Sequence, residues 1–123
     1  MTVILLALAG GVGAAVRFVV DGLIRARLNT AFPWGTVAIN ISGSLLLGAL
    51  AGFVMRGQAP ESLLLVLGTG FLGGYTTFST ASLETIRLVQ SGRTALAIIN
   101  GLGTMALSVL AAAAGVSISL LVP

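Results

Sequence analysis

Four long stretches without a charged residue constrain this chain more than any other feature of its sequence. They cover residues 1–16, 28–55, 62–83 and 94–123, which together make 96 of the 123 residues. Only six Arg and three Asp or Glu are present, whereas 57% of the residues are hydrophobic. A chain this short cannot remove so much apolar surface from water within its own core, and disorder requires high charge with low hydrophobicity. Both a soluble domain and a disordered chain are excluded, which leaves a membrane protein.

The same stretches predict helices rather than a barrel. A bilayer core about 30 Å thick is crossed by a helix of about 20 residues, whereas barrel strands alternate apolar and polar residues, and these stretches are apolar throughout. We expect an all-α membrane protein with four transmembrane helices, at residues 3–20, 35–54, 62–86 and 94–122, in a single domain over residues 1–123. No basic residue precedes the first helix, so we expect it to be retained rather than cleaved as a signal peptide.

The arginines between the predicted helices indicate an orientation. The first and third connections carry Arg25, Arg27, Arg87 and Arg93, whereas the second carries Arg56. Cytoplasmic loops carry an excess of basic residues. The count of four against one places the first and third connections in the cytoplasm.

The third stretch is chemically the most distinctive. Two adjacent glycines inside a helix cost about 1 kcal/mol each relative to alanine, and four hydroxyl side chains follow within five residues. We therefore expect the third helix to be broken at this Gly-Gly-x-Thr-Thr segment. Carbonyl groups freed by a break can coordinate a small cation, and hydroxyl groups can donate to an anion. Close packing of neighbouring helices explains the small residues equally well. The segment reads Gly73-Gly74-Tyr75-Thr76-Thr77-Phe78-Ser79-Thr80.

Three further features are candidates for function or for packing. Asn40 is an amide within an uncharged stretch, where a polar side chain marks either a permeation pathway or a bond between helices. Arg17 either extends to the membrane interface or attracts anions at a vestibule, and an i,i+4 pair with Asp21 would neutralise it. Gly48 and Gly52 form a GxxxG packing motif.

The chemistry of an enzyme is not supported. The sequence contains no His and no Cys, which are common catalytic and metal-binding side chains. Its acidic residues lie near helix ends rather than together. Nothing in the sequence indicates a nucleic-acid partner.

With these residues in view, the chain resembles the CrcB/Fluc family of fluoride channels over essentially its whole length. Three segments carry the resemblance: residues 10–17 (Gly-Gly-Val-Gly-Ala-Ala-Val-Arg), residues 35–44 (Gly-Thr-Val-Ala-Ile-Asn-Ile-Ser-Gly-Ser) and residues 70–80 (Gly-Phe-Leu-Gly-Gly-Tyr-Thr-Thr-Phe-Ser-Thr). The third segment is the most specific of them.

The resemblance implies an antiparallel, dual-topology dimer in a bacterial plasma membrane, with two pathways for passive fluoride export that lowers fluoride toxicity. It further implies a structural Na+ at the dimer centre, bound by the backbone carbonyls of Gly73 and Thr76. Arg17 corresponds to the family's arginine at the end of the first span. The implied anion pathway contains Asn40, Phe78, Ser79 and Thr80.

One position departs from the family pattern. The family usually reads Phe-Ser-Thr-Phe, with two pore phenylalanines three residues apart, but the second position here is Ala81. The chain is therefore expected either to form a homodimer or to pair with a second family member, as a non-conducting or partner-dependent subunit of a heterodimer. A small four-helix drug or cation antiporter is the remaining alternative. It would need a membrane-embedded acid, and the nearest candidates are Asp21 and Glu84.

Overall fold

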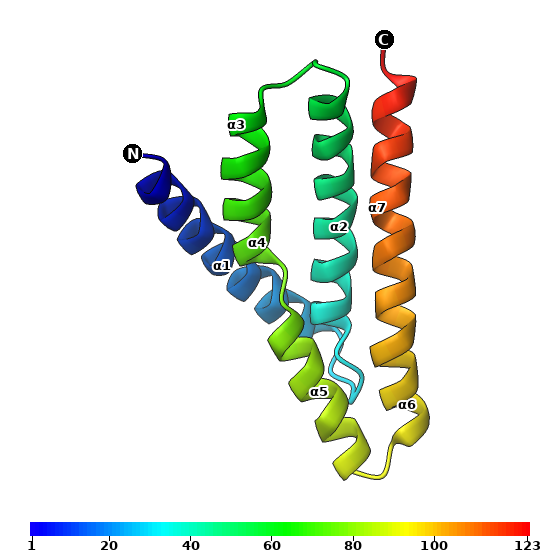
Figure 1. The fold of residues 1–123 in the computed structure, drawn as a ribbon. Coiled ribbons are helices and arrows are strands. Elements are labelled where there is room, and N and C mark those ends of the chain that lie inside the picture. The colour runs from blue at the N-terminus through cyan, green and yellow to red at the C-terminus, as the bar shows by residue number, and fades with distance from the viewer.

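The chain folds into a bundle of long apolar helices. The computed structural model describes the backbone of residues 1–123 and every side chain except that of Ser79, and the described backbone contains no strand. Four helical segments are long and apolar enough to cross a membrane, Thr2–Arg27, Trp34–Met55, Glu61–Gln90 and Thr94–Leu121 (Figure 1). This confirms the predicted all-α fold with four spans.

The first two segments are single helices and the last two are composite. α1 is Thr2–Arg27 and α2 is Trp34–Met55. The third segment consists of α3 (Glu61–Leu63), the π-helical η1 (Leu64–Leu72), α4 (Gly73–Tyr75) and α5 (Phe78–Gln90). The fourth consists of α6 (Thr94–Ile98), the π-helical η2 (Ile99–Gly103) and α7 (Thr104–Leu121).

Two helices extend further than the sequence predicted. α1 was expected to end at residue 20 but continues to Arg27, so Asp21 and Arg25 are helical rather than part of a connection. α5 likewise continues past residue 86 to Gln90 and includes Arg87. Hydropathy marks the end of the apolar core, whereas a helix continues as long as its residues favour it. Arginine is a good helix former, and a basic side chain also stabilises the C-terminal end of a helix dipole.

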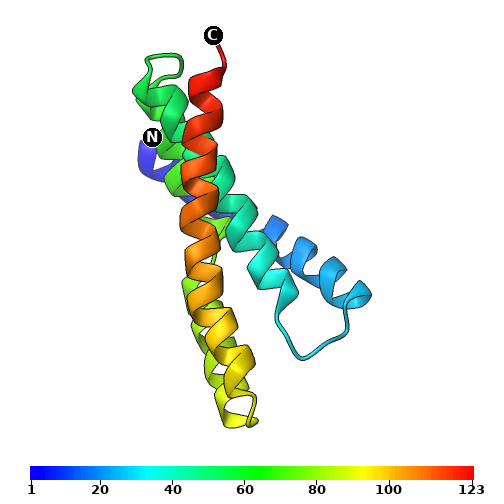
Figure 2. The same ribbon diagram turned by 90° about the vertical axis from the view of Figure 1, so that its right-hand side faces the viewer.

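α2 and α7 lie side by side over most of their lengths and form the most extensive interface of the chain (Figures 1 and 2). Gly48 and Gly52 of α2 and Gly115 of α7 permit this approach. A Cβ added at Gly48 would overlap the carbonyl of Ala112, and one at Gly52 would overlap the Ser119 side chain. This confirms the packing role predicted for the GxxxG pair.

α1 slants across the third segment at a second close contact between backbones (Figure 1). A Cβ added at Gly74 would overlap the carbonyl of Gly10, and one added at Gly13 would overlap the carbonyl of Phe71. Gly10, Gly13 and Gly74 therefore bring α1 against the point where the third segment is interrupted.

Backbone hydrogen bonds cap the C-terminal ends of α2 and α5, and an arginine side chain caps that of α7. Gly57 (φ 73°) and Gly92 (φ 80°) adopt the left-handed conformation that ends a helix. In each turn the next residue donates to a carbonyl five residues earlier, from Gln58 to Phe53 and from Arg93 to Leu88. Near the other end of α7, the Arg56 guanidinium donates to the carbonyls of Ser119 and Val122.

Most of the apolar surface faces outward. The buried hydrophobic side chains are few: Val37, Ile39, Leu72, Leu88 and Ala97. Large apolar side chains are exposed on every long helix, such as Phe18 on α1, Leu46 on α2 and Leu110 on α7. A soluble protein rarely exposes extended apolar patches of this kind, whereas lipid or a second protein chain can cover them.

Candidate functional site in the interrupted third helix

The third segment is interrupted at two threonines. α4 ends at Tyr75, Thr76 is extended (φ −80°, ψ 158°), and Thr77 is also extended (φ −148°, ψ 117°). α5 then begins at Phe78 and changes the direction of the chain (Figure 1). Gly73 and Gly74 themselves are helical, so the break follows the glycines rather than lying at them. The close contact of Gly74 with α1 explains why a residue without a side chain stands at that position.

Asn40 of α2 holds the interrupted backbone in place. Its Nδ2 donates to the carbonyl of Thr77 at 3.0 Å, and its Oδ1 accepts from the N–H of Thr77 at 2.9 Å. One side chain thus satisfies both backbone groups of a residue that has no helical partner. Because a carboxamide carries two N–H donors, the second N–H of Asn40 is left for another acceptor.

Side chains take the N–H groups that a continuous helix would use across the break. In an α-helix the carbonyl of Gly73 would accept from Thr77, and that of Thr76 from Thr80. Here the Thr77 N–H donates to Asn40, and the Thr80 N–H donates to Thr77 Oγ1 at 3.2 Å. The carbonyls of Gly73 and Thr76 have therefore lost these helical donors.

A cavity of about 300 Å³ lies beside the break. Polar side chains from three spans reach it, namely those of Arg17, Asp21, Thr36, Thr77 and Thr80. Apolar walls are provided by α1 and α2 through Ala14, Phe18 and Ile39. Thr36 is almost fully buried. The cavity thus brings hydroxyl groups and a guanidinium together between apolar helices.

The i,i+4 spacing predicted an ion pair between Arg17 and Asp21, but the structure does not contain this pair. Among the described residues Arg17 forms no ion pair, and its buried Nε has no hydrogen-bond partner. Asp21 instead accepts from Arg25 Nε at 2.8 Å. The second nitrogen of the same guanidinium, Nη2, donates to Glu84 of α5 at 3.1 Å. Arg25 thus binds both carboxylates, and Arg17 is left without an acidic partner among the described residues.

The predicted anion-pathway residues do not all converge within one chain. Thr80 lines the cavity and Asn40 contacts Thr77, which also lines it. Phe78, however, is 87% exposed on the outer surface of the bundle. The side chain of Ser79 lies outside the described residues.

One polar cluster was not identified from the sequence. Asn100 of η2 is only 2% exposed, and its Nδ2 donates to Thr85 Oγ1 at 2.8 Å and to the Ala81 carbonyl at 3.4 Å. It ties the fourth span to α5 just after the break. A full amide in an otherwise apolar stretch was the available signal, the same signal that singled out Asn40.

Together these features define a class: a helical membrane protein that crosses the bilayer several times and whose third span is interrupted beside a polar cavity. No group of three or more His, Cys, Asp or Glu that could hold a metal occurs among the described residues.

A family model described as CrcB-like protein, Camphor Resistance (CrcB), matches residues 4–116, and the chain belongs to this family. It is 49% identical over 114 residues to "Fluoride-specific ion channel FluC" of Novosphingobium aromaticivorans, with 91% of this chain and 90% of the relative covered. It is 45% identical over 115 residues to "Fluoride-specific ion channel FluC 1" of Leifsonia xyli, covering 94% and 84%. It is 43% identical over 123 residues to the "Fluoride-specific ion channel FluC" of Magnetococcus marinus, covering 99% and 100%.

Proposed function

We propose that this protein is a fluoride-selective channel that lets fluoride leave the cytoplasm passively, and that it is not an enzyme. The observation that carries the proposal is the similarity to relatives named fluoride-specific ion channels over nearly their whole length. The cavity beside the break agrees with it, because it gathers three threonine hydroxyls and Arg17, and its one acid, Asp21, is paired with Arg25.

The chemistry of the site suits a small, strongly hydrated anion. Moving an ion out of water is costly unless polar groups replace its hydration shell. Asn40 and the hydroxyls of Ser79 and Thr80 supply N–H and O–H donors, and Phe78 offers the positive edge of its ring. Arg17, with its charge unpaired, forms the vestibule that concentrates the anion. A channel must also release its ion, and hydroxyl and amide donors hold an anion less tightly than an ion pair does.

The exposed Phe78 favours a dimer as the conducting unit. Phe78 is 87% exposed in one chain, so the pore role proposed for it requires a second chain to complete the pathway. We propose an antiparallel dual-topology dimer with two fluoride pathways. Ala81 removes one aromatic ring from each chain, so a heterodimer with a second family member is the specific alternative to a homodimer.

A structural Na+ fits the donor groups at the break. The carbonyls of Gly73 and Thr76 have lost their helical N–H donors, and backbone oxygens are suitable ligands for a small cation. When bound, the ion would supply a fixed positive charge that lowers the cost of an anion in the membrane. The role of Asn40 and Thr77 Oγ1 is to hold the backbone so that these oxygens stay available.

The ion pairs argue against an antiporter. Proton exchange requires an embedded acid that is free to gain and lose a proton, but Asp21 and Glu84 are both bonded to Arg25. Loss of transport in Glu84→Gln with full transport in Asn40→Ala would favour the antiporter.

Fluoride efflux from liposomes tests the proposal. The protein is purified alone and reconstituted with Na+, and a fluoride electrode follows release while a parallel assay follows chloride. We expect fast fluoride release without chloride release. Equal release of both anions contradicts fluoride selectivity. Release that appears only after co-expression with a second family member assigns the heterodimer.

A further inference from the structure

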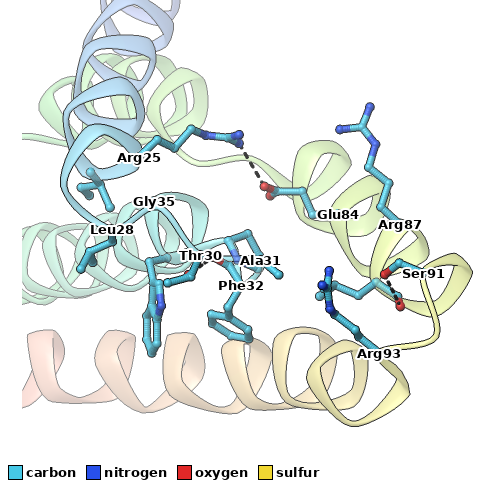
Figure 3. A pocket seen from close by; sticks show the side chains of 14 residues that line it. Arg25, Leu28, Thr30, Ala31, Phe32, Gly35, Glu84, Arg87, Ser91 and Arg93 are labelled. Atoms are coloured by element: carbon cyan, nitrogen blue, oxygen red, sulfur yellow. Dashed lines mark hydrogen bonds and ion pairs between the residues drawn. The ribbon is translucent and has the colours of Figure 1, made fainter.

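A second cavity lies at the end of the bundle that carries the α5–α6 turn, away from the break. Its volume is about 320 Å³, and it opens between the α1–α2 connection and the C-terminal end of α5. Figure 3 shows Arg87, Ser91 and Arg93 on one side of it, and Leu28, Thr30 and Phe32 on the other.

Two arginines at this cavity have no acidic partner. The acids of the described chain are Asp21, Glu61 and Glu84, and none forms an ion pair with Arg87 or Arg93. Glu84 does line the cavity, but it is 9% exposed and bonded to Arg25. The accessible charge of this cavity is therefore positive.

The opposite wall is apolar and aromatic. Phe32 and Trp34 pack with ring centroids 4.7 Å apart, and Ile24 and Leu28 at the end of α1 complete the wall. Trp34 is 46% exposed, and it begins α2, where a tryptophan typically lies at the level of the lipid headgroups. A free phosphate ion would gain nothing from contact with this apolar wall, whereas the glycerol and upper acyl chain of a lipid would bury apolar surface against it.

We propose that this cavity binds the headgroup of an anionic phospholipid. The guanidiniums of Arg87 and Arg93 have the planar donor arrangement that matches phosphate oxygens. The Ser91 and Thr30 hydroxyls at the same cavity donate to the carbonyls of Leu88 and Phe32, so the arginines are the donors for the headgroup. Basic pockets at the ends of transmembrane helices are suited to anionic headgroups. No residue lines both this cavity and the one beside the break, and the proposal does not depend on which ion the protein conducts.

The only tryptophan of the chain reports on this cavity directly. The intact protein is reconstituted in bilayers in which either phosphatidylglycerol or phosphatidylcholine carries bromine near the glycerol, and quenching of Trp34 is measured at increasing mole fraction. We expect each of the two arginines that line the cavity to raise the affinity about fivefold by binding the headgroup. We expect brominated phosphatidylglycerol to quench at a several-fold lower mole fraction than brominated phosphatidylcholine.

The variants separate a site from general surface charge. In Arg87→Gln with Arg93→Gln the preference for phosphatidylglycerol should fall to about that for phosphatidylcholine, and each single substitution should remove part of it. Arg27→Gln removes the same charge from the end of α1, does not line the cavity, and should leave the preference unchanged. Gel filtration and circular dichroism establish that each variant is folded. If the double variant does not fold, the two single variants still test the proposal.

Three results would overturn the proposal. The first is equal quenching by the two lipids in the unaltered protein. The second is an equal loss of preference in the Arg27 variant, which would show general attraction to the surface. The third is displacement of the lipid by inorganic phosphate at matched ionic strength, which would assign the cavity to free phosphate.

Discussion

Replacing Asn40 with alanine should remove the side chain that holds the interrupted helix together. Asn40→Ala leaves the N–H and the carbonyl of Thr77 without their partner. A buried polar group left unsatisfied costs about 1–3 kcal/mol. Thr77 is buried but Asn40 is only partly so, so water can reach part of the site. Each group should therefore cost about 1 kcal/mol, the lower end of that range, and the two together about 2 kcal/mol.

Two assays follow the two consequences of this change. Thermal unfolding in detergent, monitored by circular dichroism, should show a clear loss of stability. Fluoride efflux from liposomes should fall at least about tenfold, because the variant also lacks the amide donor proposed for the anion pathway, and a hydrogen bond to a charged group contributes about 1.5–3 kcal/mol. Asn40→Asp should be no better, because its carboxylate can accept from the Thr77 N–H but cannot donate to the Thr77 carbonyl and would repel fluoride.

Ser42→Ala is the matched control on the same helix. Ser42 bonds to the Tyr75 hydroxyl at 3.0 Å and to its own helix, but holds no backbone group of the break. It should cost about 0.5–1.5 kcal/mol and retain most of the efflux. The reasoning is refuted if Asn40→Ala matches the unaltered protein in both assays, or if Ser42→Ala loses efflux to the same extent.

Four other predictions test the remaining parts of the structure. Gly74→Ala should cost about 1–3 kcal/mol through the overlap of its Cβ with a carbonyl of α1, whereas Gly11→Ala, which lies inside α1 and meets no atom within 4 Å, should raise the free energy of unfolding by up to about 1 kcal/mol. Arg25→Gln should lower the free energy of unfolding by about 1 kcal/mol, because this side chain is 59% exposed and its ion pairs are partly screened; Arg27→Gln should have no effect in the same unfolding assay. Replacing Na+ with N-methyl-D-glucamine during purification and reconstitution should slow fluoride efflux, and an unchanged rate would contradict the Na+ site. Ala81→Phe should raise the efflux of the protein reconstituted alone, and a lower rate would show that alanine suits this pore.

Much of the fold could be predicted from hydropathy. The existence of four helices and the ends of the second span follow from uncharged stretches of the right length, because lipid requires every backbone polar group to be bonded within a helix. The length of α1 could not be predicted in this way. The lipid boundary falls near residue 20, whereas the helix is stabilised up to Arg27 by helix-forming residues and a basic last turn.

The candidate site could likewise be predicted only in part from the sequence. Residue types marked the segment around Thr76 and Thr77 and singled out Asn40, because a full amide in an apolar stretch is costly unless it is used. The pairing of Arg25 with both Asp21 and Glu84 could not be found from the sequence. Spacing along one helix favoured Arg17 as the partner of Asp21, and Glu84 comes close only after α1 crosses the third segment.

That the chain crosses a membrane as four helices follows from the order of its residues alone, because 96 of the 123 residues lie in uncharged stretches and apolar surface on that scale is stable only in lipid. The same residues carry the resemblance to the family. Which polar groups meet depends instead on how the helices pack. The crossing of α1, permitted by Gly10, Gly13 and Gly74, and the reach of Asn40 from α2 depend on contacts between residues far apart in the chain. Such contacts follow from the packing of whole helices, which no local pattern of residue types specifies.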